Sequence, residues 1–190
     1  MNVAEHACVV KSHHQNNVKS YEIYKAVDPA LVEELLMFFR ENDRNLYKTT
    51  LATLATNRKL RPVFVQKKPV AEQIKWMHGA LMFKPNSDIG EHLFQVWFMQ
   101  AKQDVLVTSC DALGIPHNGE GFVEGELPKE LDDEKLKNAV DSLLEKFGAS
   151  LATLYLYVFN LQIPGGWANL AETLASDERL VFQGGQAAAE

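Results

Sequence analysis

Cysteine is scarce in this sequence, and no stretch is long and apolar enough to suggest a membrane span. Two cysteines among 190 residues are too few for the disulfide framework that stabilises many small secreted domains. The longest nearly apolar run, over 151–163, is shorter than the roughly 20 residues that a helix needs to cross a bilayer. The first residues lack the basic start of a secretory signal. We therefore expect a reduced, cytoplasmic protein that is not inserted in a membrane.

The sequence also lacks the short motifs that mark common enzyme classes. No glycine precedes a Lys-Ser or Lys-Thr pair, as a phosphate-binding loop requires, and the Gly-x-Ser-x-Gly elbow of hydrolases is missing. Gly119, Gly121 and Gly125 do not match a dinucleotide-binding fingerprint, because the last glycine comes one residue late. No two histidines stand four residues apart, as zinc proteases require. These absences favour a binding protein over an enzyme, and we predict no cofactor.

Residue types that bind metals occur together only near the N-terminus. Histidine and cysteine are good ligands for zinc and copper, and four of them lie at His6, Cys8, His13 and His14. Their spacing matches none of the common zinc patterns. We therefore interpret residues 1–25 as a loosely ordered arm and predict no metal site.

Apolar residues recur at helical spacing through most of the chain. Val70, Ile74 and Met77 lie on one face of a predicted helix. The pair Asp28-Pro29 is typical of a helix start, because the carboxylate can cap the first free amides and proline fits the first turn. Such signals, repeated along the chain, predict a helical protein.

Two segments, 89–99 and 151–163, are apolar on nearly all sides, which is typical of helices at the centre of a bundle. Residues 154–159 could also form a strand, but the helical neighbours favour a helix. Glycine and proline concentrate in 114–131, the one long irregular segment. We predict an all-α domain over 26–182, an irregular bundle of about seven helices with this long loop. A flexible tail is expected at 183–190.

The 114–131 loop is a candidate rim for a small-molecule or partner site, because long loops in compact domains are often functional. Its polar residues include His117, Asn118, Glu120 and Glu124. Acidic side chains can hold Ca²⁺, but the alternating Asp/Asn pattern of a calcium loop is missing. A solvated acidic loop is the simpler interpretation.

Charge is distributed unevenly, although the net charge is only −6. Residues 44–84 hold nine Lys or Arg and one acid, whereas residues 104–145 hold three Lys and eleven acids. Within the first block, cations cluster in a connector between two predicted helices. They are Arg58, Lys59, Arg61, Lys67 and Lys68.

This basic connector has three open interpretations. It can contact the phosphates of a nucleic acid, with Phe64 or Trp76 nearby to stack on a base. The basic block can instead meet the acidic block, either within the chain or in a second copy to form a homodimer. A plain solvated surface of mixed charge is the third interpretation.

A catalytic hypothesis rests on one thiol and two imidazoles. A histidine beside Cys110 would lower the pKa of its thiol and make it a nucleophile, and His78 and His92 lie on preceding predicted helices. A buried, inert cysteine is the commoner case. We favour a non-enzymatic helical module that binds a protein or itself. A nucleic-acid-associated protein using the basic connector comes next, and a small-molecule enzyme near Cys110 comes third.

Overall fold

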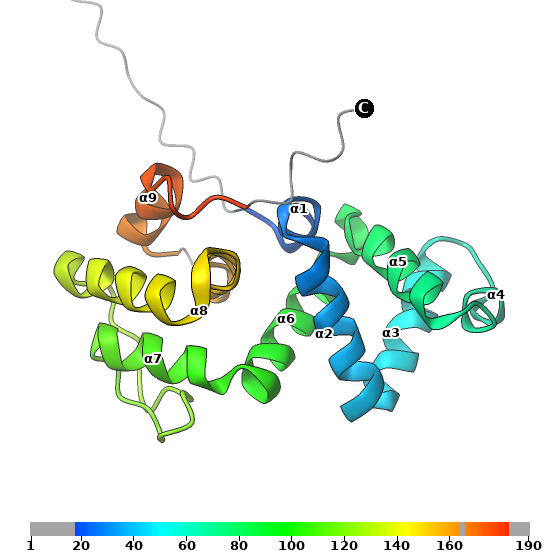
Figure 1. The fold of residues 1–190 in the computed structure, drawn as a ribbon, viewed down its shortest axis with the longest axis horizontal. Helices are drawn as coiled ribbons and strands as arrows, with labels where there is room; N and C mark the ends of the chain where they lie inside the picture. Colours follow the sequence, from blue (N-terminus) through cyan, green and yellow to red (C-terminus); the bar gives the residue numbers. More distant parts are fainter. Residues whose placement is uncertain (1–17, 164–165, 183–190) are drawn as a thin grey trace, which may run out of the picture.

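The computed structural model describes residues 18–163 and 166–182, and the regular elements of this part of the chain are all helices, with no strand (Figure 1). The predicted all-α fold is confirmed. In chain order the elements are α1 (Ser20–Ala26), α2 (Pro29–Asn42), α3 (Arg44–Asn57), α4 (Pro62–Gln66), α5 (Val70–Leu81), the 3₁₀ helix η1 (Lys84–Asn86), α6 (Ser87–Ala101), α7 (Gln103–Leu113), α8 (Asp133–Gln162) and α9 (Ala168–Ser176).

The helices form two groups joined by central helices. Figure 1 shows α7, α8 and α9 at one end and α3, α4 and α5 at the other, with α1, α2 and α6 between them. Helix α6 packs against α1, α2 and α5 on one side and against α7 and α8 on the other. The two groups therefore share one core that runs through α6.

The predicted central segments supply several of the large buried side chains. Phe94, Trp97 and Phe98 of α6 are all buried, and Tyr155 of α8 packs edge-on against Phe98 at 5.2 Å between ring centroids. One expectation fails in part, because Met99 lies on an exposed face of α6. Helix α6 therefore carries apolar residues on every side but is not buried on every side.

Local signals set the helix boundaries. The Asp28 and Asp43 carboxylates accept backbone N–H groups of Ala30 and Leu46, each at 2.9 Å, and so cap α2 and α3. Helices α6 and α7 are separated at Lys102, whose φ of −132° and ψ of 38° lie outside the helical region. Gly148 adopts φ 77° and ψ 165°, so the long helix α8 consists of two helical parts.

Two segments differ from the sequence prediction. Residues 20–25, expected within a loose arm, belong to α1, because Ile23 and Tyr24 are fully buried and Tyr24 stacks on Phe94 at 4.3 Å between ring centroids. Part of the basic connector forms the short helix α4, which begins at Pro62. The expected arm at 1–17, with its His/Cys cluster, and the tail at 183–190 lie outside the described residues.

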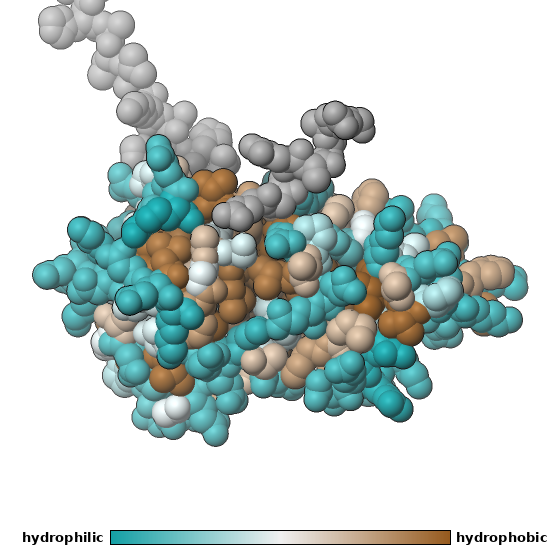
Figure 2. All heavy atoms as spheres, in the orientation of Figure 1, coloured by the Kyte–Doolittle hydropathy of each residue, from teal (hydrophilic) through white to brown (hydrophobic). Residues whose placement is uncertain are grey.

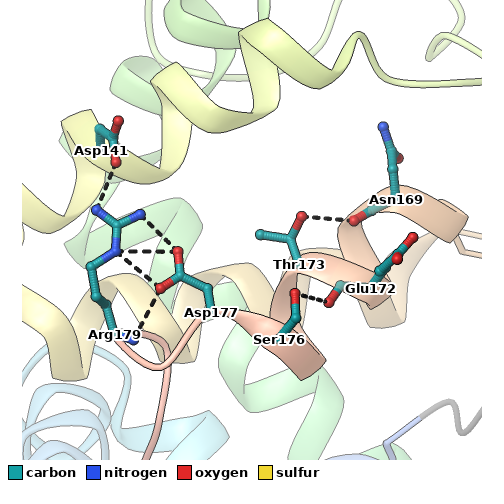
Figure 3. Close-up of polar contacts among 7 residues, drawn as sticks. All are labelled: Asp141, Asn169, Glu172, Thr173, Ser176, Asp177 and Arg179. Atoms are coloured by element: carbon teal, nitrogen blue, oxygen red, sulfur yellow. Dashed lines mark hydrogen bonds and ion pairs between the residues drawn. The ribbon is translucent and has the colours of Figure 1, made fainter.

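A polar clamp holds the segment after α9 against α8 (Figure 3). The Arg179 guanidinium donates to Asp141 of α8 at 2.8 Å and to Asp177 at 2.7 Å. Arg179 lowers the pKa of the Asp177 carboxyl, because its hydrogen bonds stabilise the carboxylate. The clamp is exposed on one side, and its cation is already matched by two carboxylates, so we interpret it as structural.

Candidate functional site

The basic connector folds into a tight turn followed by a short helix. Arg58 caps the end of α3, and Lys59 adopts φ 56°, a left-handed conformation that turns the chain. Pro62 occupies the first turn of α4, where its missing N–H costs nothing. Pro69 then precedes α5. These turns confine the predicted cations to one end of the molecule.

Large apolar side chains are exposed among these cations. The exposed fractions are 43 % for Leu60 and Val63, 63 % for Phe64 and 48 % for Phe83. Figure 2 shows apolar side chains reaching the surface among hydrophilic ones at this end. We call the following residues the basic–apolar patch: Arg58, Lys59, Leu60, Arg61, Val63, Phe64, Lys67 and Phe83.

One contact organises part of this patch. The Arg58 guanidinium lies over the Phe83 ring, 3.9 Å from its centroid, which is the geometry of a cation–π contact. The side chain of Asn57 donates to Asn86 at 2.8 Å and ties the end of α3 to η1. The guanidinium and the ring are therefore presented together on a fixed support.

Most of the predicted cations are not neutralised within the described chain. Lys68 pairs with Glu72 at 2.8 Å, an exposed pair of the kind that contributes little to stability. Arg58, Lys59, Arg61 and Lys67 form no ion pair with another described residue: the pairs found involve Lys68, Lys102, His117 and Arg179. Four positive charges therefore face solvent beside apolar surface.

The acidic block lies at the opposite end of the molecule. Residues 104–145 span α7, the long loop and the first part of α8, whereas residues 44–84 span α3 to α5 (Figure 1). Within the described ranges, no ion pair joins the two blocks. Pairing inside one chain therefore does not account for the separated charge. An external partner can still engage either end.

Only one of the two candidate stacking residues is available to a partner. Trp76 is half-buried and packs against the core, while Phe64 is the most exposed large apolar side chain of the described residues. Trp76 precedes Met77 on the apolar face that the sequence predicts for 70–81, so Phe64 is the candidate left to stack on a partner.

The comparisons with known proteins add no functional information. No family model, curated protein or solved structure matches this chain. None of the described helices combines the length and the apolar character that a membrane span needs. The chemistry of the surface therefore carries the functional interpretation.

The polar residues of the long loop are largely engaged in folding it. His117 contacts Asp111 at 3.0 Å, and the Asn118 carboxamide accepts the backbone N–H groups of Glu120 and Phe122. The carboxylates of Glu120 and Glu124 are exposed and form no ion pair with a described residue. No group of three metal-binding side chains occurs in the described part of the chain.

The residues of the catalytic hypothesis are not brought together. Cys110 lies in an apolar cavity between α6, α7 and α8, whereas His78 lines a different cavity beside α2. The His78 imidazole contacts the Tyr24 carbonyl at 2.9 Å, and burial lowers its pKa. His92 is exposed on α6. Neither His78 nor His92 is therefore in place to activate the thiol.

Cys110 should behave as an inert thiol. Its exposed fraction is 3 %, and burial raises the pKa of the thiol, so little thiolate forms near neutral pH. In a Cys8→Ser variant, we expect Ellman's reagent to label Cys110 at least about tenfold more slowly in the folded protein than in urea. Equally rapid labelling of the folded protein would instead revive the nucleophile hypothesis.

A second positively charged feature was not predicted from the sequence. A cavity of about 590 Å³ opens between α2, α3 and α5, and its rim carries Arg40, Arg44 and Lys48. Arg44 and Lys48 stand four residues apart on one helix, a spacing that places like charges on the same face. That spacing was the available signal. Arg40 joins them only because α2 and α3 meet at Asp43.

Proposed function

We propose that the protein is a non-enzymatic, cytoplasmic interaction module that binds an acidic protein surface through its basic–apolar patch. The observation that carries the proposal is the exposure of four large apolar side chains beside four cations that have no ion-pair partner among the described residues. Exposed apolar surface of this kind marks interaction sites. Arginine and aromatic residues are enriched in protein interfaces.

Electrostatics and apolar contact have separate roles in this proposal. The cations attract an acidic partner and orient it as it approaches. Burial of Leu60, Val63 and Phe64 then supplies affinity, because removal of apolar surface from water is favourable. Arg58 is already positioned over Phe83, so less side-chain freedom is lost on binding.

A second copy of this chain carries the acidic and apolar surface that such a partner needs. The exposed acids of the long loop, including Glu120, Glu124 and Glu126, lie at the end opposite the patch, and Leu127 beside them is also exposed. The basic end of one copy can therefore meet the acidic end of another. This arrangement is the intermolecular form of the charge pairing that the sequence suggested.

The proposal predicts association that depends on salt. By sedimentation velocity, we expect species of about twice 21.4 kDa or more at low ionic strength. These species should dissociate in about 0.5 M salt, where exposed charges are screened beyond a few ångströms. A monomer at every concentration and ionic strength would contradict self-association.

Two complementary variants test the orientation of the contact. Arg61→Glu with Lys67→Glu reverses charge at the basic end, and Glu120→Lys with Glu126→Lys reverses it at the acidic end. Each variant alone should remain monomeric, whereas a mixture of the two should form a heterodimer through the ends that remain intact. Lys25→Glu on α1 is the control for a charge reversal elsewhere and should leave association unchanged. A mixture that stays monomeric would contradict the proposed pairing.

The exposure of Phe64 supports one alternative function, the binding of a single-stranded nucleic acid. It is exposed between Arg61 and Lys67, and an aromatic ring among cations can stack on a base of a single strand. A fluorescent single-stranded oligonucleotide, tested at the same low ionic strength, distinguishes the two functions. Binding that weakens steeply with salt and is lost in Phe64→Ala would favour nucleic acid over protein.

A further inference from the structure

The cavity between α2, α3 and α5 is separate from the basic–apolar patch. It has a volume of about 590 Å³, within the range of small-molecule sites. Its lining is drawn from the end of α2, the first half of α3, Gln66 of α4 and Gln73 of α5. None of the patch residues belongs to this lining.

The floor of the cavity is fixed by hydrogen bonds. The Tyr47 hydroxyl donates to the Gln73 carboxamide oxygen at 3.2 Å. The Gln73 carboxamide nitrogen donates in turn to the backbone carbonyls of Gln66, at 3.0 Å, and Lys68, at 2.8 Å. Tyr47 and Leu51 are both buried. The cavity is therefore held open by α3, α4 and α5 together, without requiring a ligand to order them.

The rim of the cavity carries an excess of positive charge. Arg40, Arg44 and Lys48 line it with a single carboxylate, Glu41. None of the three cations forms an ion pair with another described residue. Like charges at this spacing repel each other and cost stability in the absence of a counter-charge. Burial raises the pKa of the Tyr47 hydroxyl, while the positive charge of Arg40 opposes that shift.

We infer that this cavity binds a small phosphate monoester, with Arg40, Arg44 and Lys48 contacting the phosphate group. Three cations and one carboxylate give the lining a net charge of +2, which matches the nearly doubly charged phosphate monoester near neutral pH. Guanidinium groups donate paired hydrogen bonds to phosphate oxygens in a geometry that a single ammonium lacks. The buried Leu51 offers apolar contact to the organic part of the molecule.

Calorimetric titration with glycerol 3-phosphate, in a phosphate-free buffer of low ionic strength, tests the inference. We expect saturable binding of one molecule per chain. Arg44→Gln removes one exposed cation from the rim and should weaken binding by about tenfold or more, because it removes charge-assisted hydrogen bonds. The circular dichroism spectrum of this variant should match that of the parent protein.

Lys75→Gln is the matched control, because Lys75 is exposed on α5 but does not line this cavity. It removes the same charge and should change the affinity by less than about twofold. Glycerol should not bind, and citrate should bind more weakly than glycerol 3-phosphate. Absence of binding, equal weakening by the two variants, or equal affinity for citrate would each overturn the inference.

The result is independent of the proposed interaction function. The variant with Arg61→Glu and Lys67→Glu should bind glycerol 3-phosphate with the affinity of the parent protein, because neither residue lines the cavity. Loss of phosphate binding in that variant would contradict a discrete site in the cavity and would indicate a diffuse basic surface. Failure of self-association with phosphate binding intact would overturn only the interaction proposal.

Discussion

Replacing Phe94 by alanine should lower the free energy of unfolding by about 3–5 kcal/mol. Phe94 is fully buried on α6, and its ring stacks on Tyr24 of α1 at 4.3 Å between centroids. Truncation of the Phe94 side chain removes buried apolar area and leaves a cavity between α1 and α6. Urea unfolding, followed by far-ultraviolet circular dichroism, measures the loss as a lower midpoint.

Phe64→Ala is the matched control for this substitution. It makes the same chemical change, but Phe64 is 63 % exposed in the basic–apolar patch, so the free energy of unfolding should change by no more than about 0.5 kcal/mol. A loss from Phe64→Ala as large as that from Phe94→Ala would contradict the described core. It would also remove the argument that the patch is free to bind a partner.

Gly121→Ala should strongly destabilise the long loop. Gly121 adopts φ 84°, and a β-carbon there would lie 2.3 Å from the β-carbon of Leu106 and 2.9 Å from two backbone atoms of α7. The left-handed conformation costs about 1–2 kcal/mol for a residue with a side chain, and overpacking costs about 1–3 kcal/mol more. We expect urea unfolding to show a total loss of about 2–5 kcal/mol.

Gly119→Ala separates the two contributions. Gly119 has φ 86°, close to that of Gly121, but an added β-carbon would have no neighbour within 4 Å. Its cost should therefore be limited to the backbone term of about 1–2 kcal/mol. Equal losses from the two substitutions would mean that the loop does not rest on α7 as described.

Most of the fold follows from local signals in the sequence. The carboxylate of Asp28, the glycine at 148 and the apolar periodicity of residues 70–81 each act within one or two helical turns, so a single sequence reveals them. Helix α1 was not predicted, because it is stabilised by contacts with the distant helix α6 and not by local signals. Tyr24 is buried against α6, where its ring stacks on Phe94 and lies close to Gly90. An added β-carbon on Gly90 would lie 2.6 Å from the Tyr24 ring.

The candidate sites show the same distinction between local sequence signals and contacts between distant segments. The cations of the connector are adjacent in sequence, so their clustering was evident from charge alone. The exposure of Phe83 beside Arg58 was not evident, because it depends on how η1 returns to the end of α3. The cavity at Arg40 and Arg44 was likewise hidden, since it is formed where α2, α3 and α5 converge. Contacts between distant segments are set by packing, which local patterns do not encode.

The separation of the two charge blocks gives the molecule a large electric dipole. Near an anionic surface the field exerts a torque that turns the α3–α4 end inward, and near a cationic surface it turns the loop end inward. The net charge of −6 therefore describes the chain only at distances large compared with the separation of the two blocks, where salt already screens most of the interaction. At closer range, an anionic neighbour meets the basic α3–α4 end, and a cationic neighbour meets the acidic loop end.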